Sequence, residues 1–264
     1  MAVPIQSLNA SVTLVRMIAT GQAPHQCEVG SATGFFFKGN ERKFLVTNRH
    51  VIIDEEDHHY PDKLVIRVHT SETSTILNRD IELPLYGADN APLWLQHRDP
   101  EIDVAALEIG HLLNTSDVIK YWVPEEFPSP NELIEIGSPV MVIGYPLRLY
   151  DTDHNLPITR SATVATVYRA HFNGKRLFLV DGSMQEGTSG SPVAMMRLSN
   201  AVTIAPGGMV SSFPTSLLGV HSGPWLHSPG FAEMGLHAVW YPELVTEIIS
   251  QNTDRLSSPR TQNH

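Results

Sequence analysis

Residues 186–192 read Glu-Gly-Thr-Ser-Gly-Ser-Pro, a run of small residues around the hydroxyl of Ser189. Gly187 and Gly190 permit backbone angles that a Cβ would forbid, so the loop is able to turn sharply. Such a turn aims successive N–H groups into one concavity, where they stabilise an anion. A serine beside such donors has what acyl transfer needs, a nucleophile and hydrogen bonds for the oxyanion that it creates. The same run also fits an ordinary surface turn, so the rest of the chain must decide.

A base and a carboxylate for this serine stand earlier in the chain. His50 follows a strand-like run that ends at Thr47, and Asp103 immediately precedes the apolar segment 104–109. A carboxylate beside an apolar strand is partly buried, and a partner is needed to offset the cost. His50, Asp103 and Ser189 are therefore candidates for a general base, the group that orients it, and a nucleophile.

Length and composition exclude several other classes of protein. The chain has 264 residues and 42% hydrophobic residues, enough for one large all-β unit or two small domains. A net charge of -10 without a basic cluster disfavours a nucleic-acid surface, and no apolar run has transmembrane length. Cys27 is the single cysteine, which excludes an internal disulfide and a cysteine-based zinc site. We expect a cytoplasmic protein because no leader is recognisable, although secretion stays open.

Strand-like runs between turn residues dominate the chain up to residue 241. We predict a turn at 30–34, a proline-rich linker at 116–135, and a helix after Pro242 with Leu244, Val245, Ile248 and Ile249 on one face. The predicted domains are an N-terminal β-barrel at 1–115, a C-terminal barrel with helix at 136–250, and a disordered tail at 251–264. The acids and histidines at 54–59 suggest a metal site, but a solvated loop is the favoured interpretation, because consecutive ligands rarely converge on one ion.

Several motifs in one order resemble the trypsin-like, chymotrypsin-fold serine peptidases. They are GSATGFFF at 30–37, FLVTNRHV at 44–51, DVAALEI at 103–109, GSPVMVIGYP at 137–146, EGTSGSP at 186–192 and LLGVHSG at 217–223. The resemblance spans about residues 10–250 and is nearest to the glutamyl-endopeptidase and HtrA-type branches. It implies an all-β fold of two six-stranded antiparallel barrels with a C-terminal helix, and no metal or organic cofactor.

The resemblance also implies a role for each matching residue. Ser189 would be the nucleophile, His50 the general base and then acid, and Asp103 the group that fixes the imidazole tautomer. The N–H groups of Gly187 and Ser189 would form the oxyanion hole, where losing one donor costs roughly 100- to 1000-fold in turnover. The alternative is a chance set of a histidine, an aspartate and a serine in a β-rich chain.

Thr188 departs from the pattern of the zymogen-activated members. Those members carry an aspartate before the nucleophile, which pairs with a newly cut N-terminal amine. Thr188 cannot form that ion pair, so we predict no activation of this kind. The site is then either preformed or switched by another element, such as a regulatory protein partner or the loop at 199–214.

Substrate preference depends on the S1 pocket, which in this family is walled by the segments matching Ser183, Met184, His221, Ser222 and Gly223. The GVHSG segment resembles the histidine segment that binds a P1 Glu or Gln in glutamyl endopeptidases and viral 3C-type proteases. Met184 stands where glutamyl endopeptidases usually have threonine, and an ordinary strand histidine explains His221 equally well. No acid stands at Ser183, which disfavours Arg or Lys at P1.

Two functions follow from the sequence. The first is an endopeptidase that cleaves protein or peptide substrates through an acyl-enzyme. The second is a latent or inactive domain of the same fold that binds peptides or waits for a partner protein. An α/β-hydrolase esterase fits poorly, because its triad has the order serine, acid, histidine and its serine lies at a strand-to-helix turn.

Overall fold

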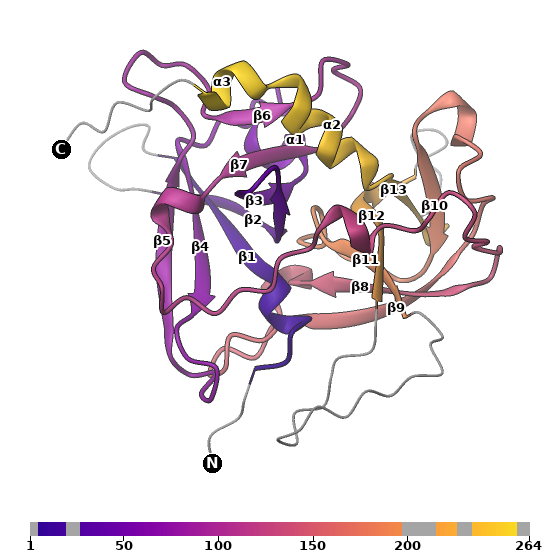
Figure 1. Ribbon diagram of the computed structural model, residues 1–264, viewed down its shortest axis with the longest axis horizontal. Helices are drawn as coiled ribbons and strands as arrows, with labels where there is room; N and C mark the ends of the chain where they lie inside the picture. Colours follow the sequence, from indigo (N-terminus) through magenta and orange to yellow (C-terminus); the bar gives the residue numbers. More distant parts are fainter. Residues whose placement is uncertain (1–4, 20–26, 197–214, 226–233, 258–264) are drawn as a thin grey trace.

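The computed structural model describes residues 5–19, 27–196, 215–225 and 234–257. Two β units lie side by side (Figure 1). The first is an antiparallel sheet of seven strands in the order β5-β4-β1-β2-β3-β7-β6, and the second is a closed barrel in the order β10-β13-β12-β11-β8-β9. The strands of the first unit are β1 (Val12–Ala19), β2 (Cys27–Gly39), β3 (Arg42–Thr47), β4 (Lys63–His69), β5 (Asn78–Pro84), β6 (Trp94–Gln96) and β7 (Ala105–Glu108).

The second unit and the helices complete the described fold. The barrel strands are β8 (Pro139–Gly144), β9 (Ile158–Val164), β10 (Leu177–Asp181), β11 (Pro192–Met196), β12 (Thr215–Pro224) and β13 (Leu236–Trp240). The α-helices are α1 (Arg49–Ile52), α2 (Glu243–Gln251) and α3 (Thr253–Ser257). Single 3-10 turns are η1 (Asn9–Ser11), η2 (Gly110–Leu112), η3 (Pro124–Glu126), η4 (Pro146–Arg148) and η5 (Phe172–Gly174). No helix within the described ranges is both long and apolar enough to cross a bilayer.

The all-β, chymotrypsin-type class is confirmed, but the first unit differs from the six-stranded barrel we expected. It has seven strands because the short strand β6 pairs with β7 at one edge of the sheet. The two edges meet where the Leu93 N–H donates to the Leu85 carbonyl at 2.9 Å. This contact brings the ends of the sheet together through a few backbone bonds rather than through a full strand pair.

Strand β2 explains why three consecutive phenylalanines stand in the sequence. Successive side chains on a strand point to opposite faces. Phe35 and Phe37 pack into a core shared with Ile143 of the second unit, whereas Phe36 packs into the core of the first unit alone. The predicted turn at 30–34 is wrong, because these residues continue β2 and pair with β1. Both faces of β2 are buried at residues 35–37, and one of these faces packs into the core that the two units share.

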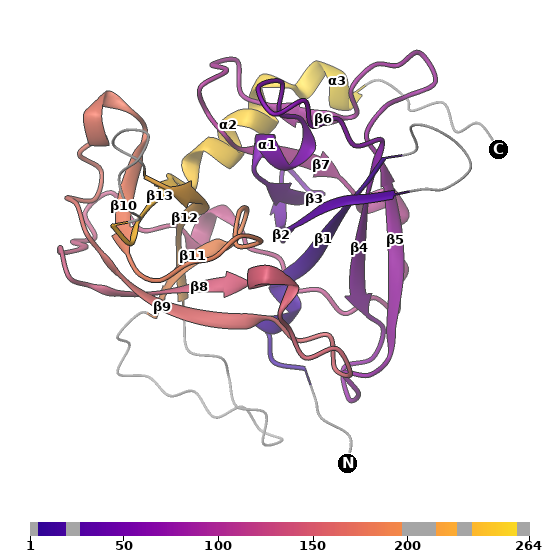
Figure 2. The ribbon, with the colours of Figure 1, turned by 180° about the vertical axis from the view of Figure 1, so that it is seen from behind.

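The C-terminal helix returns to the first unit. Helix α2 begins after Pro242, as predicted, and buries Leu244, Val245, Ile248 and Ile249. It contacts β6 and β7 and lies across them in Figures 1 and 2. The predicted disordered tail is wrong at its start, because α3 covers Thr253–Ser257 and the Arg255 guanidinium donates to the Trp94 carbonyl at 3.2 Å. Residues 258–264 lie outside the described residues.

The predicted linker packs tightly against the first unit. Trp122 is fully buried, and its backbone N–H donates to the Phe36 carbonyl at 2.9 Å. The Lys38 N–H in turn donates to the Trp122 carbonyl at 2.8 Å. The segment therefore acts as an additional edge beside β2 and helps to fix one unit against the other.

Candidate active site

His50 and Asp103 are brought together by the first unit. His50 lies in the single turn of α1, directly after β3, and Asp103 directly precedes β7, the neighbour of β3 in the sheet. The His50 N–H donates to Asp103 Oδ1 at 2.9 Å, and His50 Nδ1 lies 2.8 Å from Asp103 Oδ2. The Asn48 side chain donates to the Asp103 carbonyl at 2.7 Å. Because an ionised carboxylate only accepts, Nδ1 carries the proton and Nε2 is left as the basic nitrogen.

The environment of His50 suits a base. Burial lowers the pKa of the imidazole, but the hydrogen bond and the negative charge of Asp103 more than offset this, and the pKa is raised above 6.5. The imidazolium form is therefore stabilised by Asp103. A ring held in this way can accept a proton from a hydroxyl and later return it.

Ser222 of β12 connects Asp103 with Ser189. Its hydroxyl donates to Asp103 Oδ2 at 2.6 Å, and its carbonyl accepts a hydrogen bond from Ser189 Oγ at 2.8 Å. We had expected Ser222 only as a wall of S1, and its contact with the carboxylate was not foreseen. The Ser189 hydroxyl donates its single proton to the Ser222 carbonyl, so this hydrogen bond must break before the hydroxyl can donate to His50.

The loop before Ser189 forms the concavity expected from its glycines. Gly187 has φ +88°, and a Cβ there would lie 2.6 Å from the Tyr145 carbonyl oxygen. Gly190 has φ +82°, and a Cβ there would collide with the Thr33 carbonyl. Within the described part of the chain, neither the Gly187 nor the Ser189 N–H donates a hydrogen bond. These two amides are available to an oxyanion.

Thr33 of β2 holds this loop in place, and the sequence did not reveal it. Its N–H donates to the Ser189 carbonyl at 2.9 Å, and its hydroxyl donates to the Gly187 carbonyl at 2.8 Å. The Thr33 hydroxyl also accepts from the Tyr145 N–H at 3.0 Å. One buried threonine from the first unit thus fixes both carbonyls that flank the candidate oxyanion hole. Only its place before Gly34 in the GSATG motif could have drawn attention to it.

The remaining S1 candidates differ in their exposure to solvent. Gly223 faces open space, since nothing lies within 4 Å of a Cβ built there. Ser183 is exposed, and its carbonyl accepts from the Arg160 guanidinium at 2.6 Å. Met184 is 5% exposed and packs in the core of the second barrel. Met184 is therefore a core residue of the barrel, and a part in S1 stays a prediction.

His221 is buried behind the nucleophile loop. Its Nδ1 lies 3.0 Å from the Thr188 carbonyl, which can only accept, so Nδ1 carries the proton. Its Nε2 lies 3.2 Å from Nδ1 of His237 on β13, a partner that the sequence did not indicate. Burial and the neighbouring His237 lower the pKa of His221 to about 3, so the ring is neutral.

The family of the chain follows from comparison with known proteins. A family model described as a trypsin-like peptidase domain matches residues 32–198. The chain belongs to this family. Among solved structures, this trypsin-like peptidase domain resembles the serine endoprotease from Yersinia pestis, with TM-score 0.53 and 16% identity over 94% of this chain and 67% of that one. A structure of a variant of the HtrA-type protease AlgW with a tripeptide gives TM-score 0.53 and 14% identity over 94% and 64%. No curated protein matches the sequence.

Thr188 takes a structural part in this trypsin-like peptidase domain. It is 1% exposed, and its hydroxyl and its N–H both reach the Gln185 carbonyl, at 2.7 and 3.2 Å. The loop is therefore closed by a local turn rather than by an ion pair. The preformed concavity agrees with our expectation that no N-terminal amine is needed, which stays a prediction. The loop at 199–214 lies outside the described residues.

The acidic segment beside the site forms its own turn. Asp54 accepts the backbone N–H groups of Glu56 at 3.0 Å and Asp57 at 3.3 Å, and Glu55 pairs with the Arg49 guanidinium at 2.6 Å. Among the described residues of this trypsin-like peptidase domain, no group of His, Cys, Asp and Glu side chains is placed to hold a metal ion. The segment instead closes one side of a cavity of about 210 Å³ next to His50.

Proposed function

We propose that the chain is a serine endopeptidase whose nucleophile, base and orienting carboxylate are Ser189, His50 and Asp103. Membership of the trypsin-like peptidase family supports the activity. The observation that carries the assignment of residues is the hydrogen-bonded chain from Ser189 through Ser222 to Asp103 and His50. It brings the three candidate residues from both β units to one place.

The proposed reaction has two stages. Ser189 Oγ attacks the scissile carbonyl while His50 Nε2 takes its proton, and the oxyanion of the tetrahedral intermediate accepts from the Gly187 and Ser189 N–H groups. His50 then gives the proton to the leaving amine, and an acyl-enzyme on Ser189 remains. A water molecule, deprotonated by His50, releases the acid in the second stage.

The substrate would bind as an extended strand along β12. The edge of β12 that pairs with β11 is hydrogen-bonded up to His221, which bonds Ser191 and Gly190, while its other edge continues to pair with β13 as far as Pro224. A peptide can therefore add to the free edge at residues 222–224. A backbone N–H of the peptide would donate to the Ser222 carbonyl in place of the Ser189 hydroxyl. The Ser189 hydroxyl would then be free to donate to His50. The open space beside Gly223 leaves room for this backbone.

We propose a P1 residue with a carboxamide or carboxylate, as the sequence suggested, and expect Gln to be preferred to Glu. His221 is neutral and its Nδ1–H is held by Thr188, so its Nε2 offers a lone pair. A carboxamide N–H can donate to that atom, whereas a carboxylate cannot. The P1 side chain would have to compete with His237 Nδ1 for the lone pair on His221 Nε2.

A fluorophosphonate probe and a peptide library test these proposals together. We expect the wild-type chain to be labelled at Ser189 and Ser189→Ala not to be labelled. Cleavage of a library with varied P1 should favour Gln over Glu, and His221→Ala should lose that preference. A profile that favours large apolar P1 residues would reject the P1 proposal.

The second candidate function is a latent domain, in which the hydrogen bond from the Ser189 hydroxyl to the Ser222 carbonyl would hold the nucleophile inactive. Absence of labelling in the isolated chain, together with binding of peptides, would support this alternative and reject constitutive activity.

A further inference from the structure

A cavity of about 190 Å³ lies between the two β units and is lined by three arginines. Its lining residues are Leu14, Arg16, Arg67, Arg148, Tyr150 and Asn155. We propose that this cavity binds an acidic side chain of the peptide substrate, on the leaving-group side of the scissile bond. This inference rests on the proposed endopeptidase function and adds a second determinant of specificity to it.

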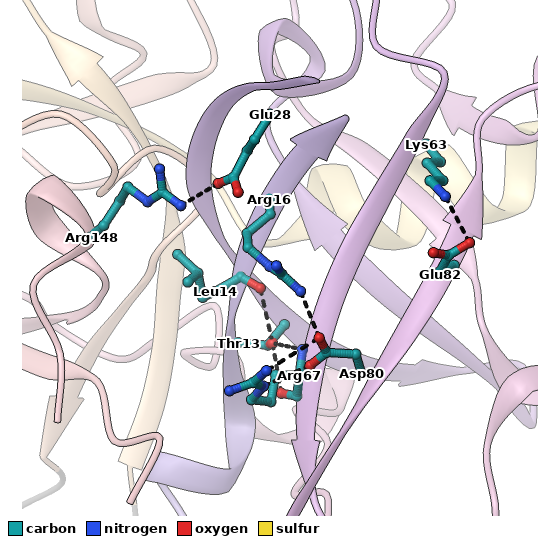
Figure 3. A network of polar contacts seen from close by, with 9 residues as sticks. All are labelled: Thr13, Leu14, Arg16, Glu28, Lys63, Arg67, Asp80, Glu82 and Arg148. Atoms are coloured by element: carbon teal, nitrogen blue, oxygen red, sulfur yellow. Dashed lines mark hydrogen bonds and ion pairs between the residues drawn. The ribbon is translucent and has the colours of Figure 1, made fainter. Parts of the chain in front are cut away.

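The charges around the cavity leave it positive. Arg16 and Arg67 both contact the carboxylate of Asp80, at 2.7 and 2.6 Å, and Arg148 lies 2.5 Å from Glu28 (Figure 3). Two carboxylates thus face three guanidinium groups, and the excess is one positive charge. This excess is local, because the whole chain carries a net charge of -10.

The guanidinium groups also have N–H donors that can bind a further carboxylate. Each guanidinium carries several N–H donors in a planar fork, which suits a carboxylate. Arg16 donates to Asp80 through Nη2, and the Nη2 atom of Arg148 lies against Glu28 Oε1. The side chain of Arg148 is 52% exposed and that of Arg16 is 29% exposed, so both remain accessible to a ligand. Tyr150 and Asn155 add polar groups to the same wall.

The arginine cavity is adjacent to the nucleophile loop by two routes. Along β1 and β2, Leu14 pairs with Thr33, whose N–H donates to the Ser189 carbonyl, and Arg16 lies two residues further, about 7 Å along the strand. From the second unit, the Leu147 N–H donates at 2.6 Å to the carbonyl of Glu186, the residue before Gly187. Arg148 follows immediately.

The cavity is built from other elements than the proposed acyl subsites, so we place it on the leaving-group side of Ser189. Residues 222–224 of β12 and residues 183–185 belong to the side on which the P1 residue would bind. The cavity is instead built from β1, β4 and the segment after β8. A peptide that passes Ser189 from the β12 edge therefore reaches the arginines with the part that leaves as the amine.

The turn that presents Arg148 is conformationally preset. Leu147 and Arg148 both have left-handed backbone angles, with φ +49° and +59°. Non-glycine residues adopt this region rarely, and such pairs persist where the surrounding structure holds them. Here the Leu147 N–H is tied to Glu186 and the Arg148 N–H to the Tyr145 carbonyl at 3.2 Å. The arginine is therefore fixed to the loop that forms the oxyanion hole.

Matched peptides test the proposal. Each peptide keeps one sequence before the scissile bond and carries Glu or Gln at the second or third residue after it. We expect wild type to prefer Glu at one of these positions by about tenfold in kcat/KM, because hydrogen bonds to charged groups are strong. Arg148→Gln and Arg16→Gln should abolish the preference. Lys63→Gln, which breaks the Lys63–Glu82 ion pair elsewhere on the same sheet, should retain it (Figure 3).

Two controls separate this inference from the proposed function. An aminocoumarin amide with no residues after the scissile bond should be cleaved equally by wild type and Arg148→Gln. Binding of the Glu and Gln peptides to Ser189→Ala, followed by fluorescence anisotropy, tests the cavity even if no peptide is cleaved. Equal cleavage and equal binding of the two peptides would overturn the inference while leaving the peptidase intact. Competition by inorganic phosphate without any Glu preference would also overturn it, because the cavity would then take a free anion.

Discussion

The Ser222 carbonyl accepts a hydrogen bond from Ser189 Oγ at 2.8 Å, while the Ser222 hydroxyl donates to Asp103 at 2.6 Å. One residue of β12 thus contacts both the candidate nucleophile and the carboxylate that orients the candidate base. Through this residue the second barrel supports a histidine and an aspartate that belong entirely to the first unit.

Ser222→Ala removes one of the donors to the Asp103 carboxylate. Hydrogen bonds to charged groups contribute about 1.5–3 kcal/mol, so we expect kcat/KM to fall about tenfold or more. The carboxylate becomes more basic and raises the pKa of His50, which moves the acidic limb of the pH–rate profile to higher pH. A pH–rate profile of purified enzyme measures both effects. An unchanged profile would show that the hydroxyl does not act through Asp103.

Thr33→Val removes the hydroxyl that ties the Gly187 carbonyl and leaves the Tyr145 N–H without its acceptor. The loop should loosen, and an unsatisfied buried group costs about 1–3 kcal/mol of stability. We expect slower fluorophosphonate labelling of Ser189 and a lower melting temperature. Thr33→Ser, which keeps the hydroxyl, should restore most of the labelling rate. If Val and Ser behaved alike, the hydroxyl would have no part in positioning the loop.

Gly187→Ala tests the proposed oxyanion hole directly. A methyl group at φ +88° would lie 2.6 Å from the Tyr145 carbonyl, so the loop must move. We expect turnover to fall roughly 100- to 1000-fold, as when an oxyanion donor is lost. Gly174→Ala is the control, since it has φ +77° but nothing within 4 Å of an added Cβ. It should share the backbone strain and keep normal activity.

The acidic limb of activity should report the pKa of His50. Only the neutral ring acts as the base, and Asp103 raises the pKa above 6.5, so activity should fall at a pH higher than for a free imidazole. In Asp103→Asn burial still lowers the pKa of His50 while both effects of Asp103 disappear and only the smaller charge effect of Asp54 still raises it, so the limb should move to lower pH, with turnover reduced about 10⁴-fold. A limb at the same pH in both proteins would refute this assignment.

His221 should make the fold sensitive to acid. Its pKa is lowered to about 3 in the folded protein, below the ordinary value of 6.5, so the unfolded chain binds more protons between these values. The free energy of unfolding contributed by this residue is complete above pH 6.5 and is lost progressively as pH falls toward 3. Urea unfolding from pH 7 to 4 should show a shallower loss for His221→Gln than for wild type.

The sequence by itself determined the class of fold and the triad candidates. Strand-like runs separated by turns predict a β protein, and the small residues around Ser189 predict a sharp loop, because both depend on local backbone preferences. The helix after Pro242 was predicted for the same reason, since its apolar face follows helical spacing. The resemblance supplied the order of the motifs, and with it the pairing of His50, Asp103 and Ser189.

Only the tertiary structure decided what touches what. Thr33, His237 and the second contact of Ser222 act through hydrogen bonds between residues far apart in the chain, which no local pattern records. Strand β6 and helix α3 are both too short to be ordered by their own sequence. Strand β6 is stabilised by pairing with β7, and helix α3 is stabilised by its contact with β6. The arginine cavity arises in the same way: Arg16, Arg67 and Arg148 are isolated cations in an acidic sequence, and they meet because β1, β4 and the turn after β8 converge.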